Sequence, residues 1–378
     1  MARESKTGFG PSTTVSRRLR HAAEVAVGQV LRARRGERVL IITNPSEDVR
    51  RISMALYDAA IDAGAEPTLV FQPVKSQLDL ADDAVIHALR SEPEMIVSIS
   101  RDKLGKDRFA MKKNYKYKKG SFNHIFNYLL GSKKSRAFWS PSVTVKMFES
   151  TIPVDYKKLR DNCGKLTRVL DRAAEVHIAT RLGTDLVLGL RGRKARTDDG
   201  DFSKPGSGGN LPAGEVFISP ELGTGEGTLV YDGSISSDRG VILIKKPIEI
   251  TVRKNLVTGI RGGREASQLK ATLDRARKST HRFASEGKIP RRELGGYIEN
   301  IRNLGELGIG LNEKARIGGN MLEDEKVFKT CHIAIGSNYD DDAKALIHLD
   351  GLIKNPTMTL IDAGGRRTPV MKNGKIII

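Results

Sequence analysis

The sequence predicts an α/β protein in two parts: an N-terminal α/β domain with a mainly parallel sheet, and a C-terminal α+β domain with mainly antiparallel strands. In the first part, short β-rich runs alternate with stretches of helical period, which is typical of helices packed on the faces of a parallel sheet. In the second part, short strands follow one another across Gly, Pro and Asp turns. We therefore expect residues 1–155 and residues 156–378 to fold as two domains.

Local periodicity defines the elements of the first domain. Apolar residues at helical spacing alternate with short β-rich runs. The expected helices cover Val15–Arg35, Ser46–Ala63 and Asp82–Leu89, and the expected strands cover Arg38–Thr43, Glu66–Phe71 and Met95–Ser100. The nearly continuous apolar character of these strands is typical of strands buried on both faces. No GxGxxG or Walker-type loop follows the first strand, so the sequence assigns no nucleotide to this domain.

The second domain begins after a connecting passage, Pro141–Tyr156, with an amphipathic helix over Lys157–Ala174. The strands that follow are interrupted by one further predicted helix, Ala266–Arg282. The glycine-rich stretch Lys204–Gly214 either forms a mobile lip over a site or simply connects two strands.

Composition narrows the class of protein. The 378 residues are 39% hydrophobic and 5% aromatic, which is ordinary for a globular protein. No apolar run reaches the roughly 18 residues of a membrane span, and no apolar stretch follows the N-terminal charges as it would in a secretory signal. Two cysteines, Cys163 and Cys331, are too few for a disulfide framework, so we expect a reducing, cytoplasmic location.

The chain is strongly basic, with a net charge of +19. The excess is dense in Arg101–Lys119, where Tyr115 and Tyr117 alternate with lysines. Such a segment is either a phosphate-contacting patch with stacking aromatic rings or a solvated basic loop. Because no nucleic-acid-binding motif accompanies it, a nucleic-acid partner is an alternative that we do not favour.

The stretch Glu325–Asp350 holds two histidines, carboxylates and a tyrosine. In the predicted strand ALIHLDG, His348 and Asp350 are two residues apart and share one face. His332 lies on the predicted strand CHIAIG, and Tyr339 follows that strand. An imidazole beside a His-x-Asp pair can hold a divalent cation, although two unrelated histidines on half-buried strands would show the same pattern.

Further carboxylates point to the same chemistry. Glu215 opens GEVFISP, and Glu306 shares a strand face with Gly308 and Gly310, which would leave room for a metal and its substrate. Glu325 is the weakest candidate, because acidic residues in a run such as EDEKVF are usually solvated. Carboxylates that gather without cations repel one another. Glu215, Glu306, Glu325 and Asp350, with two neutral imidazoles, would balance two divalent ions.

These motifs together resemble a known family. NLPAGEVFISP, GTGEGTLVYDGSI, LGELGIGLN, DEKVFKTCHIAIGSNY and IHLDG occur in the order typical of the thermophilic (M29-type) metallo-aminopeptidases, densely from about residue 157 onward. The resemblance implies that residues 156–378 are a metal-binding catalytic domain with two divalent ions per chain, typically zinc, cobalt or manganese. It also implies a homodimer and a peptide substrate.

The resemblance places metal ligands at Glu215, Glu306, Glu325, His332, His348 and Asp350, and an active-site tyrosine at Tyr339. The main hypothesis is therefore a cytoplasmic metallo-aminopeptidase in which two metals activate a shared water. Glu306 would bridge the metals, Glu306 or Glu325 would carry the proton, and Tyr339 would bind the oxyanion. The absence of HExxH and GxSxG argues against a zincin or a serine hydrolase.

Two other functions stay open at this stage. The same superfamily includes an iron-dependent ring-cleaving dioxygenase that acts on dihydroxypyridine, and such an enzyme would keep only His332, His348 and Asp350 as a mononuclear triad. The other alternative is a non-catalytic relative that binds nucleic acid through the lysines of Arg101–Lys119. One iron per chain with oxygen uptake, or salt-sensitive RNA binding without hydrolysis, would distinguish them from the peptidase.

Overall fold

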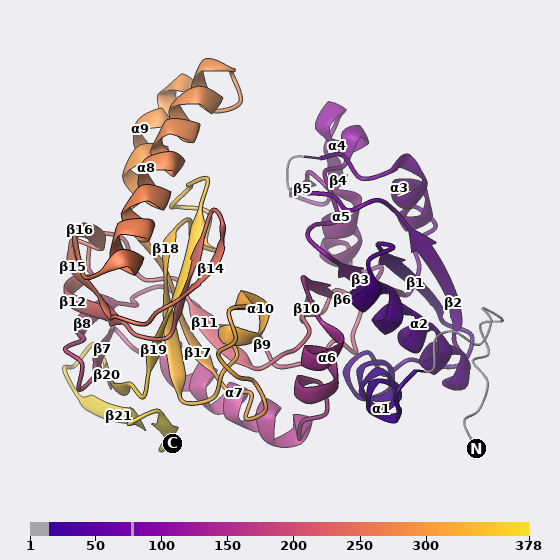
Figure 1. The fold of residues 1–378 in the computed structure, drawn as a ribbon, viewed down its shortest axis with the longest axis horizontal. Helices are drawn as coiled ribbons and strands as arrows, with labels where there is room; N and C mark the ends of the chain where they lie inside the picture. Colours follow the sequence, from indigo (N-terminus) through magenta and orange to yellow (C-terminus); the bar gives the residue numbers. More distant parts are fainter. Residues whose placement is uncertain (1–14, 77–78) are drawn as a thin grey trace. The chain divides into compact units, whose positions relative to one another are not determined.

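The computed structural model describes residues 15–76 and 79–378, and these residues form two compact units (Figure 1). The first unit runs to Arg160 and also takes in Asp198–Ala213, while the second comprises Asp161–Thr197 and Gly214–Ile378. The N-terminal residues 1–14, for which the sequence predicts no secretory signal, lie outside the described part. The expected fold class is confirmed, because the first unit has a parallel sheet and the second has antiparallel sheets.

The first unit is built on a parallel sheet with the strand order β10-β6-β3-β1-β2 in the described residues. Its strands are β1 (Arg38–Thr43), β2 (Glu66–Phe71), β3 (Met95–Ser100), β6 (Arg136–Pro141) and β10 (Gly208–Asn210). Its main helices are α1 (Arg17–Val25), α2 (Glu47–Asp62), α3 (Asp83–Leu89), α5 (Ile125–Gly131) and α6 (Val145–Thr151). The expected helix Val15–Arg35 is α1 continued by a π-helical turn, Ala26–Val30.

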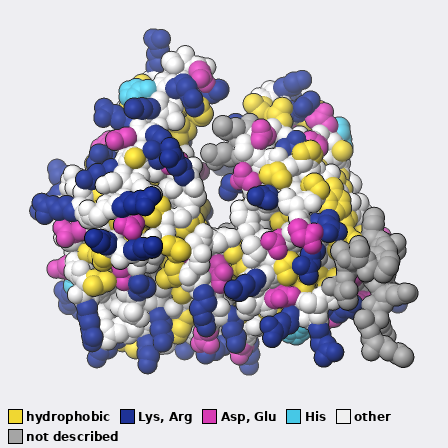
Figure 2. All heavy atoms as spheres, in the orientation of Figure 1, with side chains coloured by type: hydrophobic (Ala, Val, Ile, Leu, Met, Phe, Trp, Pro, Cys, Tyr) yellow, Lys and Arg dark blue, Asp and Glu magenta, His cyan; other side chains and the backbone are white. Residues whose placement is uncertain are grey.

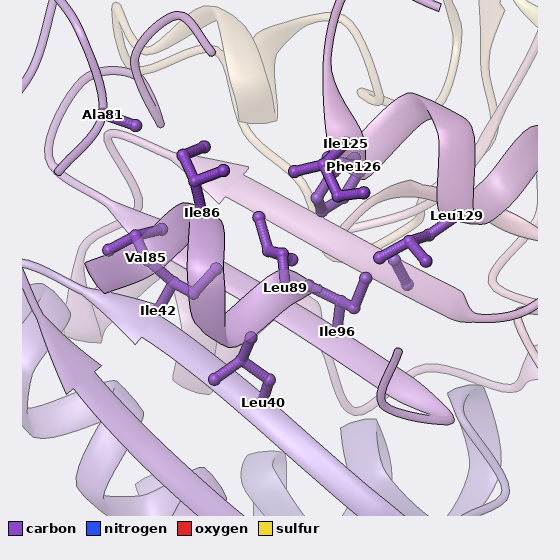
Figure 3. Close-up of a cluster of buried hydrophobic side chains, with 11 residues drawn as sticks. Leu40, Ile42, Ala81, Val85, Ile86, Leu89, Ile96, Ile125, Phe126 and Leu129 are labelled. Atoms are coloured by element: carbon purple, nitrogen blue, oxygen red, sulfur yellow. The ribbon is translucent and has the colours of Figure 1, made fainter. Parts of the chain in front are cut away.

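Helices cover both faces of this sheet. The chain moves outward from β1 to β2 and then back to β3, so right-handed crossovers place α2 and α3 on opposite faces. On the α3 face, Leu40 and Ile42 of β1 pack against side chains of α3 and α5 (Figure 3). Burial on both faces explains why the strand sequences are nearly continuously apolar.

The basic segment Arg101–Lys119 folds into α4 (Arg108–Lys112) and the first strand of a hairpin, β4 (Tyr115–Tyr117) with β5 (Gly120–Phe122). Tyr115 packs on Tyr128 with ring centroids 5.5 Å apart, so this tyrosine supports the hairpin. Figure 2 shows Lys and Arg side chains spread over the visible surface, with Asp and Glu between them. The glycine-rich stretch provides the edge strand β10, which pairs in parallel with β6.

The second unit contains two antiparallel sheets. One has the order β14-β13-β19-β18-β17-β11-β9 and the other the order β16-β15-β12-β8-β7-β20-β21-β22 among the described residues. The first comprises β9 (Arg196–Asp198), β11 (Glu215–Ile218), β13 (Ser234–Ser237), β14 (Gly240–Leu243), β17 (Leu304–Gly310), β18 (Thr330–Gly336) and β19 (His348–Lys354). The second comprises β7 (Glu175–Ala179), β8 (Asp185–Gly189), β12 (Glu226–Tyr231), β15 (Ile248–Arg253), β16 (Leu256–Arg261), β20 (Thr357–Ile361), β21 (Arg367–Lys372) and β22 (Lys375–Ile376).

Helices complete this unit. The two helices expected in the second domain correspond to α7 (Tyr156–Leu170) and α8 (Arg264–Ser285). The boundary between the two units lies within α7, after Arg160. α8 extends from the sheets with α9 (Leu294–Asn300) beside it (Figure 1), after the short turn Arg291–Glu293, and α10 (Met321–Asp324) leads into β18. Within the described residues, no helix combines the length and apolar character that crossing a membrane requires.

Candidate metal centre

Neighbouring strands β11, β17, β18 and β19 bring the candidate residues to one face of the seven-stranded sheet. β17 pairs with β11 on one side and with β18 on the other, and β18 pairs with β19. Glu306 lies on β17, His332 on β18, and His348 with Asp350 on β19. Ladder pairing sets Asp350 opposite Ala334, two residues from His332, so alternation places these side chains on a common face.

Glu306 lies between the two histidines. Its Oε1 is 3.3 Å from Nε2 of His332, and its Oε2 is 2.9 Å from Nε2 of His348. Burial alone would raise the pKa of Glu306, but the two imidazoles outweigh it and lower that pKa to about 2. Glu306 therefore stays a carboxylate and places a buried negative charge at the centre of the cluster.

His348 is oriented as a metal ligand. Its Nδ1 is 2.8 Å from the carbonyl oxygen of Ser337, and since a carbonyl only accepts, this nitrogen carries a proton and donates it. Nε2 then faces carboxylate oxygens of Glu306 at 2.9 Å and Asp350 at 3.2 Å, without hydrogen-bond geometry to either. With a neutral imidazole, three acceptor atoms would face one another here, so the arrangement needs either a proton on Nε2 or a metal ion between them.

The raised pKa values of the two histidines also indicate that the cluster needs positive charge. Burial lowers the pKa of both imidazoles, but the adjacent carboxylates outweigh it, raising the pKa of His332 to about 9 and that of His348 well above its ordinary value. In the metal-free chain, protons therefore supply the missing positive charge. A divalent cation would supply it instead, by displacing those protons.

Gly308 has a different role from the one expected. A Cβ at this position would lie 1.9 Å from Nε2 of His332, so the glycine makes room for the imidazole ring. A Cβ at Gly310 would lie 2.1 Å from the backbone oxygen of Val327. The prediction that these glycines leave space for a metal with its substrate is therefore wrong, because a side chain and the backbone fill that space.

Glu215 and Glu325 are held by a residue that sequence reasoning missed. The fully buried Lys326 places Nζ 2.6 Å from Oε1 of Glu215 and 2.7 Å from Oε1 of Glu325. Burial raises the pKa of Glu325 to about 8. Within the EDEKVF run, the side chains of Glu325 and Lys326 therefore point into the protein interior. No pattern in the sequence signals this, because a lysine beside acidic residues is normally solvated.

Tyr339 lies at the exposed edge of the cluster. Its ring centroid is 5.2 Å from that of His348 and 5.0 Å from that of Phe217, and 45% of the residue is exposed. Arg196 donates to the Tyr339 carbonyl oxygen at 2.7 Å and pairs with Asp340, while Arg193 pairs with Asp340 at 3.2 Å. Partial burial of the phenol and the nearby carboxylates raise the pKa of Tyr339, so its hydroxyl stays protonated.

The structure thus brings all seven candidate residues into one region of the second unit. Two overlapping groups have their ligand atoms within 4.8 Å of one another: Glu215, Glu306 and His332, and Glu306, His348 and Asp350. Carboxylate oxygens with imidazole nitrogens suit a divalent transition metal, and Nε2 of His348 is a buried atom without a hydrogen-bond partner. The cluster is therefore suited to bind a metal ion.

Comparisons with known proteins distinguish the two enzyme hypotheses. The family model for NicX, 2,5-dihydroxypyridine 5,6-dioxygenase, matches residues 144–289, a range that includes Glu215 and ends before Glu306. A 2,5-dihydroxypyridine 5,6-dioxygenase of Pseudomonas putida is 31% identical over 108 residues, which cover 27% of this chain and 29% of that protein. The chain therefore matches less than a third of the length of this curated relative.

Two solved structures share the fold. The structure of 2,5-dihydroxypyridine dioxygenase from Pseudomonas putida KT2440 has a TM-score of 0.71 at 18% identity and covers 95% of this chain and 96% of its own. AmpT from Thermus thermophilus, an M29 aminopeptidase, has a TM-score of 0.65 at 18% identity and covers 96% and 99%. The chain therefore shares its fold with both of these structures.

The predicted metallo-aminopeptidase is wrong. The family model and the curated relative both correspond to a dioxygenase, which is an oxidoreductase, and neither is a hydrolase of peptide bonds. The predicted peptide substrate and the predicted protease activity are therefore also wrong. The ring-cleaving dioxygenase, given above as the alternative, agrees better with these findings.

Proposed function

We propose that the chain is a ring-cleaving dioxygenase that acts on a small hydroxylated aromatic ring and holds one ferrous ion through His332, His348 and Asp350. Two histidines and one carboxylate are the ligand set typical of non-haem iron(II) oxygenases. The observation that supports this best is His348, whose Nδ1 donates to Ser337 and whose Nε2 faces two carboxylates and becomes a metal ligand when its proton is displaced. In the same proposal, residues 1–155 form a separate α/β domain and residues 156–378 carry the site.

In such a reaction, both atoms of O₂ are incorporated into the aromatic substrate. One carbon–carbon bond of the ring breaks, each carbon takes one oxygen atom of O₂, and four electrons pass from ring to oxygen, so no further reductant is needed. A ferrous ion, when bound, supplies the one-electron chemistry that O₂ requires to react with a closed-shell ring. A dihydroxylated pyridine is the first substrate class to test, because the dioxygenases with similar sequence and fold are named for one.

The chain's own residues would orient the ring and move its protons. Glu306 keeps its charge, with a pKa lowered to about 2, and it lies within hydrogen-bonding distance of both imidazoles. In this proposal Glu306 receives the proton of a substrate hydroxyl directly. Tyr339 and Phe217, whose ring centroids are 5.0 Å apart, offer aromatic faces beside His348 against which a flat ring would stack.

Metal content and oxygen uptake test the proposal together. Protein reconstituted anaerobically with Fe(II) should consume one O₂ per ring and add two oxygen atoms to 2,5-dihydroxypyridine, as mass spectrometry with ¹⁸O₂ would show. His348→Ala should lose iron and oxygen uptake. His177→Ala is the matched control, because His177 also pairs with an aspartate, Asp185 at 2.6 Å, but on the other sheet.

The result that overturns the proposal is equally specific. Two zinc, cobalt or manganese ions per chain, with no oxygen uptake on any hydroxylated ring, would exclude a mononuclear iron oxygenase. Iron binding that survives His348→Ala unchanged would remove this imidazole from the site.

A further inference from the structure

Lys326 occupies a position in which a charged side chain is rarely found. The residue is 0% exposed, and its ammonium group lies 2.6 Å from a Glu215 oxygen and 2.7 Å from a Glu325 oxygen. Both carboxylates are themselves buried or nearly so, with side-chain exposures of 8% and 16%. An ammonium ion in this setting is retained only because acceptors surround it.

The ammonium group shares the Glu215 carboxylate with the position at which a second divalent cation would be bound. Glu215 belongs to one of the two groups with metal-ligand spacing, together with Glu306 and His332. Its Oε1 is already taken by Lys326, and only Oε2, 3.8 Å from Nε2 of His332, is left without a hydrogen-bond partner. A divalent cation that shared Glu215 would lie within a few ångströms of the ammonium charge, and the two cations would repel each other in a poorly screened interior.

Lys326 cannot move aside easily. Its backbone N–H donates to Glu323, and its backbone oxygen accepts from Asn312 at 2.8 Å. These bonds fix the backbone at the start of the segment that leads into β18, and the ammonium group cannot move away without losing its contacts with Glu215 and Glu325. By contrast, within the described part of the chain no lysine ammonium pairs with the second group, Glu306, His348 and Asp350.

We propose that the Lys326 ammonium takes the place of a second divalent ion, so that this chain holds a single metal at the end of the cluster formed by His348 and Asp350. The inference rests on the metal site of the proposed function, and it explains why that site would hold one metal ion per chain. A site with six acidic and imidazole side chains has enough donors for two metals. The lysine makes it mononuclear by occupying oxygens of Glu215 and Glu325 with a positive charge from within the chain.

The test counts metal ions without measuring turnover. The full chain is freed of metal and titrated with Mn²⁺ and, separately, with Zn²⁺ by calorimetry, and bound metal is then counted by elemental analysis after gel filtration. The wild type should bind one ion per chain and Lys326→Ala two, because the substitution vacates the space and leaves Glu215 and Glu325 without a cation. Lys326→Arg, which keeps the positive charge, is the matched control and should bind one.

Each outcome decides a separate point. Two ions in the wild type would overturn the proposal by itself, whatever the variants do. One ion in folded Lys326→Ala would also overturn it, because the lysine would then not limit the count. If Lys326→Ala folds only with metal present, the ions are counted in protein prepared with metal; if it folds in neither state, Lys326→Gln takes its place. No ion in any variant would instead refute the metal site on which the proposed function depends.

Discussion

Replacing Gly308 by alanine tests how closely the strands of the metal centre fit together. The added Cβ would lie 1.9 Å from Nε2, 2.1 Å from Cε1 and 2.7 Å from Cδ2 of His332. Ordinary carbon contacts are about 3.5–4.0 Å, so the imidazole must move by more than ~1 Å. His332 is fully buried, so any such movement also disturbs its neighbours.

The expected loss has two parts. Forcing an extra methyl group into a packed interior costs about 1–3 kcal/mol of folding free energy. Moving the ring also takes Nε2 out of line with Glu306, now 3.3 Å away, and should weaken metal binding by about 10–100-fold, as disturbed metal sites generally do. Gly308→Ala should therefore be less stable and should bind metal more weakly than the wild type.

Urea denaturation and metal titration of the same preparations measure the two parts separately. Gly318→Ala is the matched control, because its Cβ would meet no heavy atom closer than 3.9 Å and the position lies near α10. The control should change neither quantity. A Gly308→Ala protein with wild-type metal affinity would refute the inference that this glycine makes room for a ligand imidazole.

Two further predictions concern pH and packing. Metal affinity should rise with pH towards about 9, because the carboxylates outweigh burial and raise the pKa of His332 to about 9 in the metal-free chain, and only the neutral imidazole binds metal. Mn²⁺ titrations at several pH values should show the dissociation constant falling as the pH rises to 9, because His332 and His348 must each lose a proton to bind metal, and a constant value from pH 6.5 to 9 would contradict the assignment. Tyr231→Phe should lower the free energy of unfolding by ~1 kcal/mol, because the fully buried Tyr231 hydroxyl donates to the Ile333 carbonyl at 2.8 Å and the substitution removes this buried hydrogen bond. Urea denaturation checks this, and a loss below ~0.5 kcal/mol would show that the carbonyl finds another donor.

Local patterns were sufficient for β1, β2 and β3 of the first unit, whereas β6 and β10 of the same sheet were not predicted. The runs Arg38–Thr43, Glu66–Phe71 and Met95–Ser100 form strands with those bounds, since each is an apolar run delimited by polar or turn residues. The predicted bounds of the helices were less accurate. The periodic stretch from Val15 forms α1 followed by a π-helical turn, and α8 extends beyond both of its predicted ends. Helix ends depend on capping and on contacts with other elements, which periodicity does not include.

The site shows where sequence reasoning stops. The shared face of His348 and Asp350 follows from the two-residue period of a strand, and their 3.2 Å approach agrees with it. The resemblance to the aminopeptidases selected residues that do gather, but it favoured the wrong reaction, since peptidases and dioxygenases share this fold. The sequence did not identify Lys326 as part of the site, because its partner Glu215 is 111 residues away along the chain.

The sequence by itself determined the fold class and the face of each strand on which a side chain lies, because both depend on backbone geometry that repeats over a few residues. Only the tertiary structure decided which distant side chains meet: Glu306 between two imidazoles, Gly308 beneath a ring, and Lys326 between two carboxylates. The physical reason is that strand order and register bring these groups together, while the charge that each one carries depends on burial and on its neighbours.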